Sequence, residues 1–92
     1  MFILGMVKWI HYNGIVDSTV YRFKNARLAM FFGDHPPAHV HLLGPGFNVS
    51  IDVETLKTKG NGDAKTIAEA KTWISDNKAA VMAIWIERGT KR

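Results

Sequence analysis

The stretch "FFGDHPPAHVHLLGPGFNVSIDVET", residues 31–55, decides the fold of this 92-residue chain. It holds three of the four histidines, a double proline, and a run in which apolar and polar residues alternate strictly. The apolar members of the run are Phe47, Val49, Ile51 and Val53, and the polar members are Asn48, Ser50, Asp52 and Glu54. A period of two is typical of a β-strand with one face on the core. Residues 47–54 are therefore predicted to form such a strand.

Residues 38–43 predict a second strand, and the Gly-rich segment between the two strands predicts a hairpin. With a loop of residues 44–46, His41 would pair with Val49 and both imidazoles would face the core. With a loop of residues 43–46, His41 pairs with Asn48, His39 with Ser50, and Val40 with Val49. A slip of one residue would turn a whole strand inside out, so we predict the second register. The polar face then consists of His39, His41, Asn48, Ser50 and Asp52, with Asp34 and His35 at its rim.

Further strands are predicted at residues 27–32 and at either 6–12 or 19–23. The segment "TKGNGD", residues 58–63, is interpreted as a loop, and Asp63 is a good N-cap for a following helix. That helix carries apolar residues at helical spacing, and a second helix over residues 78–88 is followed by Gly89 as its C′ residue. The expected apolar positions are Ile67, Ala70, Trp73 and Ile74 in the first helix, and Val81, Ile84 and Trp85 in the second.

The predicted fold is therefore α+β: a small antiparallel β-meander with two C-terminal helices packed on one face. The chain is expected to be a single domain of residues 1–92, with an N-terminal lead (1–25), a β-rich region (26–55) and a helical region (63–89). Trp9, Trp73 and Trp85 are interpreted as core anchors, and His11 as an ordinary surface or half-buried histidine.

The composition narrows the chemistry. The chain has no cysteine, which excludes disulfides, thiolate metal sites and cysteine nucleophiles, so any metal would need nitrogen and oxygen ligands. A formal charge of +4 favours acidic partners, although the basic residues are scattered along the sequence. We interpret residues 1–10 as mature protein, expect no transmembrane segment, and expect a cytoplasmic location.

The motif "DHPPAHVH" followed by "GPGFNVSIDVET" resembles the signature of a small prokaryotic family, domain of unknown function 4160. The likeness covers residues 26–87 and leaves residues 1–25 outside it. It points to Asp34, His35, Pro37, His39, His41 and Asp52. The resemblance also implies a gene that stands beside another small gene, an arrangement like that of a toxin and antitoxin pair.

Three interpretations of the histidines remain open. In the first, His35, His39 and His41 bind zinc or another first-row divalent metal, with Asp34 or Asp52 as an oxygen ligand. In the second, the imidazoles perform metal-free acid-base chemistry on a phosphodiester. No lysine or arginine lies within the motif to hold a phosphate. In the third, the histidines make structural hydrogen bonds and present a polar surface to another chain.

The predicted function is a component of a toxin-antitoxin-like two-gene module that binds a partner through its His-rich face. That partner would be a small protein encoded nearby, nucleic acid or a second copy of the chain. The alternative is a metal-dependent or histidine-driven phosphodiesterase or ribonuclease, whose catalytic candidates are His35, His39 and His41. A concave histidine site with basic residues nearby would favour the enzyme, and a flat face covered by a second chain would favour the binding module.

Overall fold

The computed structural model describes residues 18–88. Predictions for the strand within 6–12, for Trp9, for His11 and for Gly89 lie outside these residues. The elements are β1 (Thr19–Arg22), β2 (Arg27–Ala29), β3 (His39–Gly44), β4 (Phe47–Asp52), β5 (Thr58–Lys59), α1 (Ala64–Asp76) and α2 (Lys78–Arg88). The predicted α+β class is confirmed, and β1 lies within 19–23, the second of the two places expected for an early strand.

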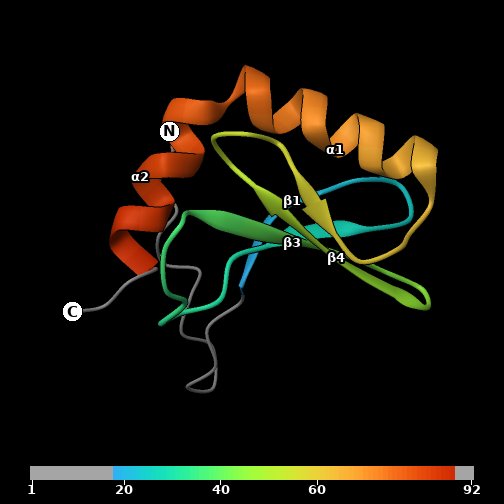
Figure 1. Cartoon of the computed structure of the whole chain (residues 1–92), viewed down its shortest axis with the longest axis horizontal. Coiled ribbons are helices and arrows are strands. Elements are labelled where there is room, and N and C mark those ends of the chain that lie inside the picture. Colours follow the sequence, from blue (N-terminus) through green and yellow to red (C-terminus); the bar gives the residue numbers. More distant parts are fainter. Residues whose placement is uncertain (1–17, 89–92) are drawn as a thin grey trace.

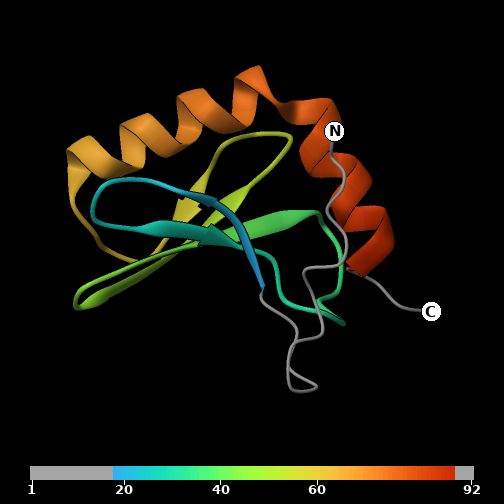
Figure 2. The ribbon, with the colours of Figure 1, turned by 180° about the vertical axis from the view of Figure 1, so that it is seen from behind.

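The five strands form one antiparallel sheet in which neighbours in sequence are neighbours in space, β1-β2-β3-β4-β5. Both helices lie on the same side of this sheet, with α1 across the strands and α2 at one end (Figures 1 and 2). The Asp63 carboxylate begins α1 by accepting the backbone N–H of Thr66 at 2.9 Å, as predicted for an N-cap. Within residues 18–88, neither helix is long and apolar enough to cross a membrane.

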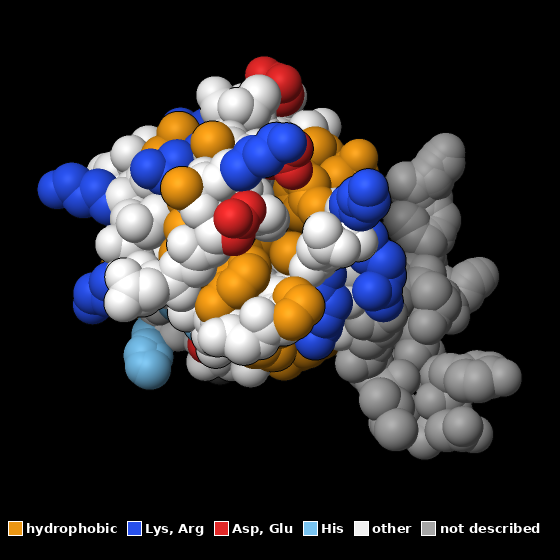
Figure 3. All heavy atoms as spheres, turned by 90° about the vertical axis from the view of Figure 1, so that its right-hand side faces the viewer, with side chains coloured by type: hydrophobic (Ala, Val, Ile, Leu, Met, Phe, Trp, Pro, Cys, Tyr) orange, Lys and Arg blue, Asp and Glu red, His pale blue; other side chains and the backbone are white. Residues whose placement is uncertain are grey.

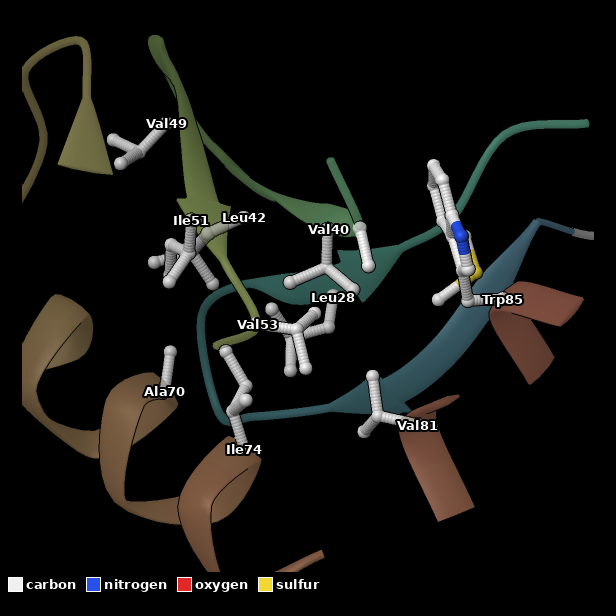
Figure 4. Close-up of a cluster of buried hydrophobic side chains, with 12 residues drawn as sticks. Leu28, Val40, Leu42, Val49, Ile51, Val53, Ala70, Ile74, Val81 and Trp85 are labelled. Atoms are coloured by element: carbon white, nitrogen blue, oxygen red, sulfur yellow. The ribbon is translucent and has the colours of Figure 1, made fainter. Parts of the chain in front are cut away.

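The core lies between the sheet and the two helices. Leu28, Val40, Leu42, Val49 and Ile51 come from the sheet, and Ala70, Ile74, Val81 and Trp85 come from the helices. Figure 4 shows these side chains converging from both layers, with Val49 at one end of the cluster and Trp85 at the other. Trp85 is 7% exposed and belongs to the core, as predicted. Trp73 is half-buried at the margin of the core, where its ring stacks on Tyr21 with centroids 4.5 Å apart.

The predicted pairing of β3 with β4 is wrong by two residues, although the predicted faces are right. His41 pairs with Ser50 rather than Asn48, His39 with Asp52, and Val40 with Ile51. A shift of two residues keeps every side chain on its own face, so the apolar-polar alternation cannot detect it. The turn sets the register instead.

That turn consists of Pro45 and Gly46 alone, between the paired residues Gly44 and Phe47. Gly46 has φ 81°, the left-handed conformation that glycine adopts without strain. Any Cβ at Gly44 would collide with the ring of Phe47, which packs over it. These two glycines therefore permit a tighter loop than the predicted residues 43–46.

The segment interpreted as a loop, residues 58–63, begins with a short strand. In β5, Thr58 pairs with Ile51 and Lys59 pairs with Ser50. The return from β4 is made by a turn in which Leu56 has φ 64° and donates its N–H to the Asp52 carbonyl. Asp52 N–H in turn donates to the Lys57 carbonyl at 2.9 Å. Backbone hydrogen bonds, which the side-chain pattern does not reveal, thus add a fifth strand.

Candidate functional site

The side of β3 and β4 that faces away from the helices carries His39, His41, Ser50 and Asp52, all half-buried. Their neighbours Val40, Leu42, Val49 and Ile51 are fully buried on the opposite side. This alternation follows directly from the pleat of the two strands. The sequence prediction that the two histidines share the non-core face is therefore confirmed.

Asp34 joins the two histidines from the loop before β3. Its Oδ2 atom lies 3.4 Å from His41 Nε2 and 3.5 Å from His39 Nε2. One ligand atom from each of the three residues lies within 4.8 Å of the others. The side chains are 19–26% exposed, so the cluster is sheltered but open to solvent. We call Asp34, His39 and His41 the Asp-His-His cluster.

A second hydrogen bond orients His39 within this cluster. His39 Nδ1 lies 2.8 Å from the carbonyl oxygen of Pro37. A carbonyl can only accept, so Nδ1 donates the hydrogen, and Nε2 lies 3.5 Å from Asp34 Oδ2. Histidines that ligate metals through one nitrogen commonly donate the other N–H to a carbonyl in this way.

The loop that carries Asp34 is tied to the end of α2. Gly33, at φ 85°, donates its N–H to the carbonyl of Arg88 at 3.0 Å. The guanidinium of Arg88, which is 6% exposed, donates to the carbonyls of Ser18 and Met30. These bonds join the last turn of α2 to the sheet and to the start of the loop.

Aromatic rings hold the two imidazoles from either side. The ring of Phe31 lies 4.7 Å from that of His41, and the ring of Trp85 lies 5.5 Å from that of His39. The two imidazoles are 5.1 Å apart and nearly perpendicular. Trp85 on α2 thus contacts one member of the Asp-His-His cluster.

His35 and Asp52, also predicted as ligands, lie outside the Asp-His-His cluster. His35 is exposed and lines a separate hollow beside His39. Asp52 Oδ1 accepts the backbone N–H groups of Glu54 and Thr55, both at 2.8 Å. The pKa of Asp52 is lowered from its ordinary value of 3.8, chiefly by the Thr55 N–H, with Glu54 N–H and the nearby His39 acting in the same direction. Asp52 thus closes the turn after β4.

Asn48 and Ser50 on β4 were both predicted to belong to a binding surface, but only Ser50 lies opposite a histidine. Ser50 pairs with His41, but Asn48 pairs with Leu43, one position from the hairpin end. Asn48 is exposed and is not part of the cluster or of the hollow. The structure thus brings Ser50 to the site and leaves Asn48 outside it.

The hollow beside the cluster has a volume of 570 Å³. Its lining includes His35, His39, Ser50, Asp52, Lys57 and Lys59. We call it the lysine hollow, and His39 is the wall that it shares with the Asp-His-His cluster. The sequence prediction missed Lys57 and Lys59 because it placed no strand between residues 55 and 63. A two-residue strand carries almost no periodic signal in the sequence.

Positive charge alone would not have located these lysines. Figure 3 shows Lys and Arg side chains spread over one face of the molecule among hydrophobic and neutral groups. Other basic side chains lie along the β1–β2 hairpin, around an open depression formed with Leu43 and Gly44. Lys57 and Lys59 are distinguished by their place beside the histidines.

The donor set of the cluster fits a metal of the first transition row. Two imidazole nitrogens and one carboxylate oxygen suit zinc, and they leave further coordination positions for water or substrate. Such a metal would polarise a phosphoryl oxygen and acidify a bound water. The Asp-His-His cluster therefore suits hydrolytic chemistry as well as metal binding.

Comparison with known proteins bears on the same residues. A family model described as "Domain of unknown function (DUF4160)" matches residues 26–86. These residues include β2 to β5, the Asp-His-His cluster, the lysine hollow, all of α1 and most of α2. No curated protein and no solved structure is significantly similar to the chain. The match spans well over half of the sequence and confirms the resemblance carried by the "DHPPAHVH" motif. The chain belongs to the DUF4160 family, domain of unknown function.

Proposed function

We propose that this protein is a small metal-dependent phosphodiesterase that acts on RNA. The observation that carries the proposal is the convergence of Asp34 Oδ2, His39 Nε2 and His41 Nε2 on one half-open position. The Pro37 carbonyl supports it, because it orients the His39 ring as in many metal sites. The concave, lysine-bearing surface next to the cluster is what an enzyme acting on an anionic substrate needs.

Exposed aromatic residues beside the cluster favour RNA over a small phosphate ester. Phe31 is 36% exposed and Phe32 is 54% exposed, and the Phe31 ring contacts His41. One side of Phe32 is taken by the Arg88 guanidinium, 5.1 Å from the ring centroid. Unpaired bases stack on exposed aromatic rings with little regard to sequence. A single strand could therefore rest a base on Phe31 while its backbone reaches the cluster.

We further propose that the enzyme works in the cytoplasm as one component of a toxin-antitoxin-like two-gene module. A toxin of this kind would be held inactive by a small partner protein encoded nearby. The same surface, including Phe31 and Phe32, offers the apolar contact that such a partner would cover. Binding of the partner and cleavage of RNA would then compete for one face.

The test uses protein purified without a histidine tag. We expect zinc, manganese or nickel to bind with a stoichiometry of about one per chain, and a fluorescent RNA oligonucleotide to be cleaved only when metal is present. The double variant His39→Asn, His41→Asn should lose both properties, whereas His35→Asn should keep the metal stoichiometry. Lysate nucleases are controlled for by purifying the double variant in parallel.

Other outcomes separate the alternatives. Cleavage that persists in a chelator, with a bell-shaped profile between about pH 5 and 8, would establish metal-free imidazole catalysis instead. Absence of cleavage together with tight binding of a neighbouring gene product would leave a binding module. Absence of cleavage, of metal binding and of partner binding would contradict every role proposed for this face.

A further inference from the structure

Two rows of side chains run from β3 across β4 to residues 57–59 on the face that holds the histidines. One row is His41, Ser50 and Lys59, as given by the pairing of His41 with Ser50 and of Ser50 with Lys59. The other is His39, Asp52 and Lys57, as given by the pairing of His39 with Asp52 and by the Asp52 N–H that donates to the Lys57 carbonyl. Directly opposed residues on adjacent strands share a face. Each row therefore runs from an imidazole to a lysine.

Neighbouring strands are about 4.8 Å apart, so each lysine backbone stands roughly 10 Å from that of its histidine. Both lysines and His39 nevertheless line the same hollow, so the lysine and histidine side chains face one shared space. We infer that the lysine hollow is a phosphate-binding site in which the ammonium groups of Lys57 and Lys59 bind the phosphate oxygens. This assignment deepens the proposed function, on which it rests, by naming the residues that would hold the substrate's phosphodiester backbone.

The charges that face the hollow favour a phosphate over a neutral ligand. Lys57 and Lys59 contribute two positive charges, and the Asp52 carboxylate contributes one negative charge. Asp52 Oδ1 is already bonded to the backbone N–H groups of Glu54 and Thr55, which spreads part of its charge into the turn. The net charge of the hollow is therefore positive even with both histidines neutral. Ser50 adds a hydroxyl donor, and His35 adds a ring nitrogen.

The arrangement also separates two tasks. Asp34 and His41 belong only to the Asp-His-His cluster, Lys57 and Lys59 line only the hollow, and His39 belongs to both. A compact ammonium makes a point-like ion pair with a phosphate oxygen and requires no fixed orientation of the ester. The lysine hollow is thus suited to holding a backbone phosphate irrespective of base sequence.

The test measures anion binding apart from hydrolysis. Metal-free protein in a chelator is titrated with inorganic phosphate and followed by the backbone amide signals of residues 50–59 in nuclear magnetic resonance spectra. We expect Lys57→Ala, Lys59→Ala to raise the apparent Kd for phosphate about tenfold, which corresponds to roughly 1.4 kcal/mol. Lys65→Ala, a matched removal of an exposed lysine on α1, should leave Kd unchanged. Raising the salt from about 50 to about 200 mM should weaken binding in the wild type, because the ammonium groups are exposed.

The assignment of a phosphate site would be overturned if the double lysine variant changed the Kd for phosphate by less than threefold. It would also be overturned if Lys65→Ala changed that Kd equally. The proposed function is judged separately, by metal stoichiometry and by RNA cleavage. If the wild type cleaves RNA, the double lysine variant should have a higher KM and should still bind the metal. An unchanged KM would contradict the phosphate site in the lysine hollow but not the proposed phosphodiesterase function. If the wild type binds phosphate through the lysines but cleaves no RNA, the phosphodiesterase proposal fails while the anion site stands.

Discussion

His39 on β3 lies directly opposite Asp52 on β4, yet the two side chains take part in different arrangements. His39 points its Nε2 at Asp34 and donates from Nδ1 to Pro37, whereas Asp52 accepts from the turn residues Glu54 and Thr55. The β3–β4 pair thus places the His39 imidazole, which belongs to the Asp-His-His cluster, beside the Asp52 carboxylate, which is hydrogen-bonded to the turn. The consequence is that mutations at neighbouring positions should separate site chemistry from stability.

Metal should stabilise the wild-type protein and not the double variant His39→Asn, His41→Asn. A ligand present at about 100 times its Kd adds about 2.7 kcal/mol to the free energy of unfolding, which raises Tm by roughly 10 to 20 °C for a domain of this size. Differential scanning fluorimetry with zinc and with nickel measures the shift. His35→Asn is the matched control and should respond as the wild type does. An equal rise in the double variant would show that the metal binds elsewhere.

Asp34→Asn should abolish the metal response with little loss of stability. Asp34 is half-buried on a loop and its removal opens no cavity in the core. Asp52→Ala should do the opposite: it removes two hydrogen bonds to the turn, costs about 1 to 2 kcal/mol in the free energy of unfolding, and leaves the metal response intact. Urea titration with and without zinc measures both effects. The assignment of Asp34 as a metal ligand would be wrong if Asp34→Asn kept the metal response and Asp52→Ala lost it.

Stability should decline in acid partly through Asp52. Its folded-state pKa lies below the ordinary value of 3.8, so its contribution is complete above about pH 4 and is lost as the pH falls through the lower folded-state value. The carboxyl group must be protonated there, which weakens the bonds from Thr55 and Glu54. Urea midpoints measured from pH 5 down to pH 2 should therefore fall less steeply for Asp52→Ala than for the wild type. Parallel curves would exclude this linkage.

Trp85→Ala should cost about 3 to 5 kcal/mol, enough to threaten the folded state of a small domain. Trp85 is part of the core and also contacts the His39 ring. Trp73→Ala should cost less, because Trp73 is only half-buried and stacks on the exposed Tyr21. Ile86→Ala is the control on the same helix, since Ile86 is 71% exposed and its truncation should change stability by no more than about 0.5 kcal/mol. Circular dichroism during urea titration ranks the three variants, and a mild effect at Trp85 would contradict its place in the core.

Much of the fold follows from local patterns. The alternation in residues 47–54 predicts which side chains of β4 are buried, because successive side chains of a strand point to opposite faces. Asp63 predicts the start of α1, because a carboxylate there can accept an N–H that the helix leaves without a partner. The common face of His39 and His41 follows from the same alternation.

The rest was decided only by the tertiary structure, since it depends on where separate segments meet. A two-residue slip in the β3–β4 hairpin leaves every face unchanged, so only the Pro45–Gly46 turn selects the pairing of His39 with Asp52. Asp34 reaches the histidines because Gly33 is bonded to Arg88 at the far end of the chain. Lys57 and Lys59 reach the same face through the backbone hydrogen bonds that pair residues 57–59 with β4, and these bonds carry no side-chain signature. The sequence by itself thus determined the residue types and faces of the site, and long-range backbone contacts determined which of those residues stand together.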